Sequence, residues 1–279
     1  MPWTTARFEY ALEAGPLGAQ YTDPTVLRQG PTVTDNWLTA PFNPSLSVNG
    51  PDGRAQATRA GDKLRLALPM FSDAAGHRSE PLRVVESGET VLSDGSGKVI
   101  ARNDEPGQGV FDVPARGQWY ELTSSAHHES PEWKLGTHIT DTWRFRSEHT
   151  GGERPLPLLD TRYDMAGLDG DNSVPAGRES FGLGIGRQSG ARGGAGVERV
   201  SVRYSTDDGA TWHTAEVRGR DGDRRVTVPA TGAGWVSLRV TAADRSGASV
   251  AETVTRAYRV GCPEEWCGYA PAWPHWPAG

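Results

Sequence analysis

Short segments in which polar and apolar residues alternate recur along the chain, and they restrict the folds that it can adopt. Examples are "DKLRLALPMF" from Asp62, "QWYELTSS" from Gln118, "DTWRFRSE" from Asp141 and "VERVSVRYS" from Val197. A period of two places successive side chains on opposite faces of a strand, as in an antiparallel sheet with one buried face. The 35 glycines and 20 prolines among 279 residues supply turns between such strands. The sequence therefore predicts an all-β protein.

A group of turn-forming residues divides these segments into two series. The stretch "GGERP", which begins at Gly151, interrupts the alternation, as expected at a boundary. We predict an irregular N-terminal segment plus a first β-sandwich over residues 1–150, and a second sandwich over residues 151–260. The strand spacing of the second series is typical of an immunoglobulin-like or fibronectin-like sandwich. Residues 261–279 form a separate tail rich in Trp and Pro.

Charge and hydrophobicity exclude two classes of partner. The formal net charge is -6, whereas a nucleic-acid binder needs a basic surface that neutralises phosphates. No run of apolar residues approaches the eighteen or so that a membrane-spanning helix requires. The residues after Met1 carry neither the basic nor the apolar region of an export signal. We therefore predict no nucleic-acid partner and no membrane span.

One motif stands out in the second series. Ser205, Asp207, Gly209, Thr211 and Trp212 have the spacing of the Asp-box found in sialidases. Glycine can take the positive φ that a strand reversal needs, and Asp, Ser and Thr side chains can bond to the backbone of such a turn. Sialidase Asp-boxes recur with the period of a propeller blade, and this sequence has one box without such a repeat. The motif therefore predicts a structural hairpin and not a glycosidase site.

Other patterns are too incomplete to predict a catalytic, cofactor or metal site. The sequence contains no Gly-x-Ser-x-Gly nucleophile motif, and "AHHES" from Ala126 lacks the His-Glu-x-x-His zinc pattern, so a polar turn is favoured. The stretch "MAGLDGDNS" around Asp169 could bind calcium through its carboxylates, but it lacks the EF-hand register, and a solvated loop is favoured. The glycine-rich stretch from Gly182 to Gly196 is predicted to be a flexible loop.

The tail combines cysteines with aromatic residues. Cys262 and Cys267 could form a disulfide, remain free thiols or contribute half of a metal site. Trp266, Trp273 and Trp276 offer flat surfaces on which a sugar or cell-wall ligand could stack, although such a tail can equally fold back on the sandwich.

Several blocks, taken in order, resemble the region that follows the catalytic domain in large secreted subtilisin-like serine peptidases of actinobacteria. They are "RAGDKLRLALPMFSDAAGH", "GVFDVPARGQWYELTSSA", "DTWRFRSEHTGGERPLPLLDTRYDM", "VPAGRESFGLGIGRQSGA", "VERVSVRYSTDDGATWHTAEV" and "GAGWVSLRVTAADRSGASVAETVTRAYRV". The resemblance covers residues from about 30 to 260, and it is stronger in the second half. Asp207, Gly209 and Trp212 match a hairpin of that region.

The resemblance implies a role without catalysis. In such peptidases an N-terminal subtilisin domain carries the Asp, His and Ser of the active site, so no catalytic residue can be assigned here. The implied function is to pack against, stabilise or target a protease domain, in cis or in trans, outside the cell. The alternative is a free-standing extracellular module that binds cell-wall polysaccharide or peptide through exposed aromatic residues. Neither reading requires a cofactor.

Overall fold

The computed structural model describes residues 6–11, 15–22, 36–46, 55–79, 86–128, 133–220 and 224–261, with the backbone alone for residues 7–11 and 15–18. Every regular element in these residues is a β-strand, which confirms the predicted all-β class. No helix that could span a membrane occurs in this part of the chain.

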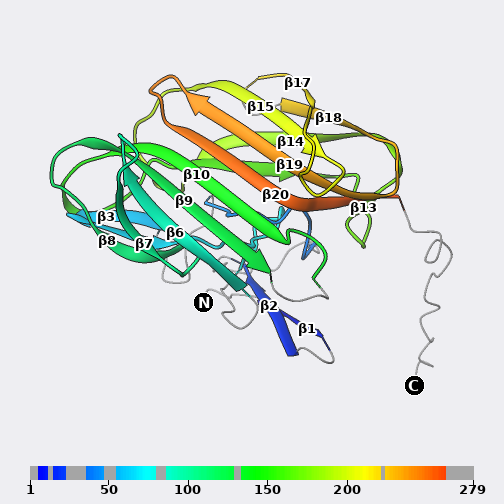
Figure 1. Cartoon of the computed structure of the whole chain (residues 1–279), viewed down its shortest axis with the longest axis horizontal. Helices are drawn as coiled ribbons and strands as arrows, with labels where there is room; N and C mark the ends of the chain where they lie inside the picture. The colour runs from blue at the N-terminus through cyan, green and yellow to red at the C-terminus, as the bar shows by residue number, and fades with distance from the viewer. Residues whose placement is uncertain are drawn as a thin grey trace, which may run out of the picture.

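A long sheet of nine strands runs across the molecule (Figure 1), in the order β16-β15-β19-β20-β10-β9-β6-β7, with the short β13 beside β20. These strands are β6 (Glu86–Asp94), β7 (Val99–Asn103), β9 (Gln118–His128), β10 (His138–Ser147), β13 (Ser173–Val174), β15 (Val197–Ser205), β16 (His213–Thr214), β19 (Gly234–Asp244) and β20 (Ser249–Val260).

Three smaller sheets accompany the long one. One contains β11 (Thr150–Pro155), β3 (Ala57–Gly61), β4 (Lys63–Ala67) and β8 (Gln108–Asp112) in that order. Another contains β12 (Leu159–Asp164), β14 (Gly177–Arg187), β18 (Arg224–Ala230) and β17 (Glu216–Arg218). The third contains β1 (Ala6–Ala11), β2 (Gly15–Tyr21) and β5 (Arg78–Ser79).

The long sheet is built alike from both halves of the chain, β3 to β11 and β12 to β20. The first half contributes β10-β9-β6-β7 and the second contributes β20-β19-β15-β16, so the strand order is symmetric about the centre. At the centre β10 pairs with β20 in antiparallel register, from His138 opposite Thr255 to Arg144 opposite Ser249. Gly151, at the predicted boundary, lies within β11 and beside the sheet of the first half. A shared sheet, and not a linker, therefore joins the two strand series.

Side chains on the inner face of the long sheet form the core with the four-stranded sheets. The Trp143 indole of β10 donates a 2.9 Å hydrogen bond to the carbonyl of Leu159, where β12 begins. In the second half, the Phe181 ring of β14 lies 6.1 Å from that of Tyr163 and 6.4 Å from that of Tyr258 on β20. All five side chains are at most 5% exposed, so the two layers pack as in a β-sandwich.

The glycine-rich stretch from Gly182 differs from its prediction. Residues 182–187 belong to strand β14, which pairs with β12 and β18, and only the later residues form a loop. The Arg162 side chain of β12 crosses this strand so closely that a Cβ added at Gly186 would lie 2.1 Å from its Nη2. Glycine here makes room for a neighbouring side chain, so a glycine-rich composition does not by itself indicate a loop.

Candidate functional site

The hairpin between β15 and β16, which we call the Asp207 turn, contains the five residues of the predicted motif. Ser205 Oγ donates to Asp207 Oδ1 at 2.6 Å and accepts from the Gly209 amide at 2.8 Å. Asp207 also accepts from the Thr211 amide at 2.8 Å and the Thr211 hydroxyl at 2.6 Å. These donors, Ser205 first, lower the Asp207 pKa to about 2, because they stabilise the carboxylate form. Gly209 has the positive φ of 92° that the reversal needs.

Neighbouring side chains tie this turn to the long sheet. The Arg239 guanidinium of β19 lies 4.2 Å from the centroid of the half-buried Trp212 ring, close enough for a cation–π contact. Asp208 accepts two hydrogen bonds from Arg256 of β20, at 3.0 and 2.7 Å. The polar side chains of the motif are thus engaged within the turn, and its neighbours anchor it to two strands.

The incomplete metal motifs are also accounted for by local contacts. The polar turn predicted for "AHHES" is wrong for residues 126–128, which belong to strand β9. The exposed His127 ring stacks on His138 at 3.7 Å across β9 and β10, whereas Glu129 lies outside the described residues. Asp169 Oδ1 accepts from the amides of Asp171 and Ser173, both at 2.9 Å, as in a closed turn. Among the described residues no group of three or more His, Cys, Asp or Glu side chains could hold a metal ion.

The predicted features of the tail cannot be placed. Cys262, Cys267, Trp266, Trp273 and Trp276 all lie outside the described residues. The disulfide and the aromatic stacking surface therefore stay predictions.

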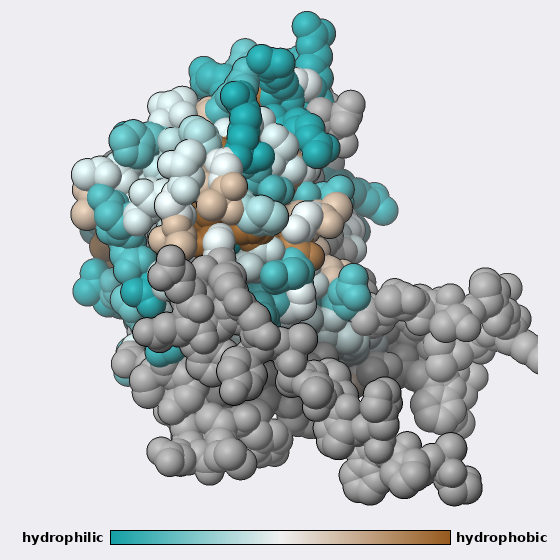
Figure 2. Space-filling view, turned by 90° about the vertical axis from the view of Figure 1, so that its right-hand side faces the viewer, coloured by the Kyte–Doolittle hydropathy of each residue, from teal (hydrophilic) through white to brown (hydrophobic). Residues whose placement is uncertain are grey.

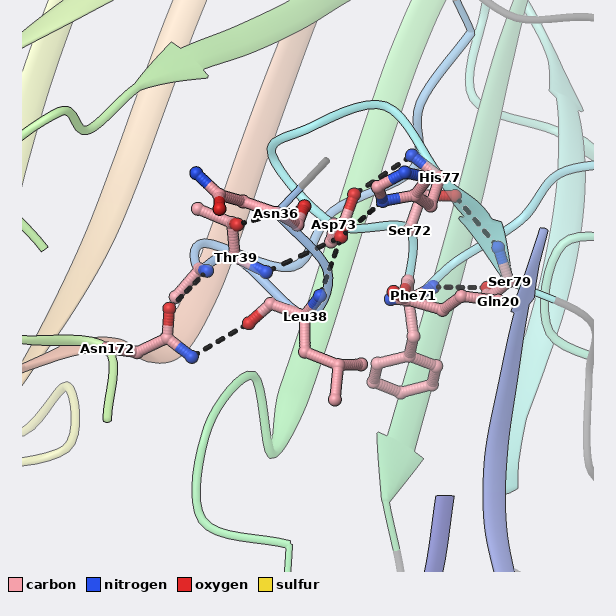
Figure 3. Close-up of polar contacts among 11 residues, drawn as sticks. Gln20, Asn36, Leu38, Thr39, Phe71, Ser72, Asp73, His77, Ser79 and Asn172 are labelled. Carbon is pink, nitrogen blue, oxygen red and sulfur yellow. Dashed lines mark hydrogen bonds and ion pairs between the residues drawn. The ribbon is translucent and has the colours of Figure 1, made fainter. Parts of the chain in front are cut away.

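A buried network around Asp73 was not predicted (Figure 3). Its carboxylate accepts from the amides of Leu38 at 2.8 Å and Thr39 at 3.4 Å, and from the His77 amide at 2.9 Å. His77 Nδ1 lies 2.8 Å from the same carboxylate. Asn172, from the second half, donates to the Leu38 carbonyl at 2.8 Å. The irregular segment 36–46 is thereby fixed to both halves of the chain.

A second buried network, the Glu252 cluster, lies where β10 and β20 meet. Glu252 accepts hydrogen bonds from the hydroxyls of Thr161 and Tyr163 and from the Asn43 amide at 3.1 Å. Asp141 faces Glu252 directly across the two strands, and both side chains are 1% exposed. Burial raises the pKa of both carboxyls, and the neighbouring Glu252 raises that of Asp141 further. The two carboxyls therefore titrate as a pair, and both hold a proton more tightly than free carboxyls do.

Two cavities lined by described residues could accept a ligand. One, of about 380 Å³, lies between Trp37 and the loop that carries Asp169 and Asn172. Two of its polar side chains already have hydrogen-bond partners, because Asp169 closes its own turn and Asn172 bonds to the backbone of Leu38. Trp37 in turn stacks on His77 at 3.8 Å. This cavity therefore belongs to the network that fixes segment 36–46.

The other cavity, of about 340 Å³, lies at the end of the second half where β19 begins and β20 ends. Its lining comes from Tyr204 and Thr206 of the β15 end, His213 of β16, the stretch 229–236 between β18 and β19, and Val260 of β20. Figure 2 faces this end of the molecule and shows apolar surface recessed among more polar residues. We call it the Tyr204 pocket and take it as the candidate binding site.

No sequence pattern could have identified this pocket. Its aromatic lining residues, Tyr204, His213 and Trp235, come from three strands, and their proximity follows from the antiparallel pairing of β15 with β16 and β19. A comparison of the sequence with protein-family models and with curated proteins finds no match.

Proposed function

We propose that this chain is a non-catalytic accessory region of a secreted subtilisin-like serine peptidase, which packs against, stabilises or targets a protease domain. The observation that carries the proposal is the continuous sheet of both halves, from β16 to β7. A sheet of this kind makes the two strand series one rigid body, which suits a scaffold. The sequence blocks that resemble such peptidases lie in both series.

The environment of the acid and base side chains supports a role without catalysis. Asp73, His77 and Glu252 are each at most 4% exposed and are used in contacts that join segments distant in sequence. Asp207 is used within its own turn. A general base must reach a substrate proton, and these groups are engaged in structural contacts instead.

The native product tests the proposal. Intact mass and N-terminal sequencing are measured on protein recovered from culture fluid and from cells. We expect a secreted species much heavier than the 30.0 kDa of this chain, extended upstream by a domain with the Asp, His and Ser of a subtilisin. A species that consists of this chain alone, with no associated peptidase in either fraction, would contradict the accessory role.

The second candidate function is the binding of polysaccharide or peptide by a free-standing extracellular module. Because the tryptophans of the tail cannot be placed, the observation that favours this function is the Tyr204 pocket. Its volume of about 340 Å³ lies at the lower end of the range usual for ligand sites, roughly 300–1,000 Å³.

A further inference from the structure

The Tyr204 pocket gathers polar side chains that have no hydrogen-bond partner. Within the described residues, no hydrogen bond uses the side chains of Tyr204, Thr206, His213, Thr231 or Trp235. The adjoining Asp207 turn differs, because its Ser, Asp and Thr side chains are all engaged. Polar groups that converge on a cavity and remain unpaired are available to a ligand.

Three aromatic residues, Tyr204, His213 and Trp235, contribute to the lining. The Tyr204 and His213 rings lie 5.5 Å apart with a tilt of 35°. Trp235 is held from outside the pocket by two guanidinium groups, those of Arg256 and Arg259, each 5.7 Å from its ring. Aromatic rings in such an arrangement present flat apolar faces beside hydroxyl and N–H groups.

A β-bulge shapes the wall that carries Trp235. The register between β19 and β20 shifts between Val236 and Leu238, and Arg256 opposite takes a positive φ of 55°. The Arg256 amide donates to Ser237 Oγ at 3.0 Å, which closes the irregularity. Bulges re-aim side chains and are common beside binding sites. The position of Trp235 is therefore set by the fold.

The charge of the lining limits the chemistry of the ligand. Among the described residues that line the pocket none is Asp, Glu, Lys or Arg, so this lining offers no fixed charge to balance a phosphate or a carboxylate. A matching ligand is neutral, carries several hydroxyls and has an apolar face that can lie on an aromatic ring. A pyranose sugar has all three properties, since its axial C–H groups form such a face.

We propose that the Tyr204 pocket binds a neutral sugar, either free or at the end of an oligosaccharide. The inference rests on the second candidate function proposed above, whose ligand it specifies, and it does not depend on the accessory role. A proline-rich peptide also binds to aromatic surfaces, but it lies in an extended groove. The Tyr204 pocket is a half-open recess lined by the ends of β15, β19 and β20, by His213 of β16 and by the turn between β18 and β19.

The test follows the indole N–H signal of Trp235 in the full chain labelled with nitrogen-15. The signal is assigned by its absence in Trp235→Phe. The probes are methyl β-glucoside, methyl α-mannoside, methyl β-galactoside and diacetylchitobiose, together with a proline-rich peptide. We expect at least one sugar to shift this signal in a saturable way. If no sugar shifts it, or if the peptide alone does, the proposal is wrong.

Two variants show whether the pocket is responsible. Tyr204→Phe keeps the ring and removes the hydroxyl, so we expect about a tenfold higher dissociation constant for the sugar that binds, as for the loss of one hydrogen bond. Trp119→Phe is the control, because this half-buried ring stacks under Arg144, 3.9 Å from its centroid and outside the pocket. Equal affinities in the parent protein, Tyr204→Phe and the control would overturn the assignment to this pocket. Amide spectra of the variants verify that each is folded.

Discussion

The Asp207 turn and the Glu252 cluster both concentrate hydrogen bonds on a carboxylate, but the pKa of Asp207 is lowered and that of Glu252 is raised. In the exposed turn, donors from Ser205 and Thr211 lower the Asp207 pKa to about 2. In the buried cluster, Glu252 also accepts from several donors, yet burial outweighs them and its pKa is raised.

The difference shows that solvation, and not the number of hydrogen bonds, decides the preferred charge state here. Transfer of a carboxylate from water into the core has a large free-energy cost, which its donors offset only in part. Consequently, loss of the exposed carboxylate leaves donors that water can satisfy. Loss of the buried carboxylate leaves donors that water cannot reach. The two sites should therefore respond very differently to substitution and to pH.

The largest effect is expected for Glu252→Ala. This substitution leaves the hydroxyls of Thr161 and Tyr163 without their acceptor, removes one of the three acceptors of the Asn43 amide, and opens a void between β20 and β12. We expect the free energy of unfolding to fall by roughly 3–5 kcal/mol, as measured by urea denaturation. The control is Glu121→Ala, at an exposed position of the adjacent strand β9, where about 0.5 kcal/mol or less is expected. Similar losses in both variants would show that Glu252 contributes no more to the free energy of unfolding than an exposed glutamate does.

An intermediate effect is expected in the pH dependence of stability. Burial raises the pKa of Asp160 from 3.8 to about 6. A raised folded-state pKa means that the folded protein binds the proton more tightly. The stability due to this group is therefore fully present below about pH 4 and lost as the pH rises through 6. Glu252 and Asp141 act in the same direction.

The measurement is urea denaturation at several values between pH 4 and pH 7, on the parent chain and on Asp160→Asn. Asparagine cannot ionise, and its carbonyl can still accept from the Leu46 amide, which donates to Asp160 Oδ1 at 2.8 Å. We expect the loss of stability over this interval to shrink by roughly 2–3 kcal/mol. An unchanged pH profile would mean that Asp160 titrates normally in the folded state.

The same two regions show how far the sequence could predict the structure. The hydrogen bonds within the Asp207 turn join residues between Ser205 and Thr211, so the residue types and their spacing suffice to predict them. The Glu252 cluster joins residues that are 91 and 209 positions apart for Thr161 and Asn43. Only the registers of several strands bring these residues together, and no local pattern encodes those registers.

The fold shows the same limit. Alternating residues identified the strands and hence the all-β class, because the period of two is a local property. The pairing of β10 with β20 was not predictable, since Asp141 and Glu252, at its centre, are polar residues on an otherwise apolar face. The Tyr204 pocket was missed for the related reason that its lining residues come from several strands, which only strand pairing brings together.

The smallest effect is expected for Asp207→Ala. The substitution removes the acceptor of the Thr211 amide and hydroxyl, but both are exposed and water replaces the lost contacts. We expect a lower melting temperature at pH 7, with a smaller change than for Glu252→Ala, and faster hydrogen exchange at the Thr211 amide. Asp104→Ala, at an exposed acid with no recorded partner, should change neither.

The difference in melting temperature between the parent chain and Asp207→Ala should depend on pH. The lowered pKa of about 2 means that Asp207 contributes stability above the unfolded-state pKa near 4, and that this contribution is lost as the pH falls toward 2. The difference in melting temperature between the parent chain and Asp207→Ala should therefore narrow between pH 4 and pH 2. In the same range the Asp160→Asn difference should change little, because Asp160 is already protonated in the folded protein and only the unfolded parent chain still titrates there. If both differences narrowed together, the opposite pKa shifts of the exposed Asp207 and the buried Asp160 would be wrong.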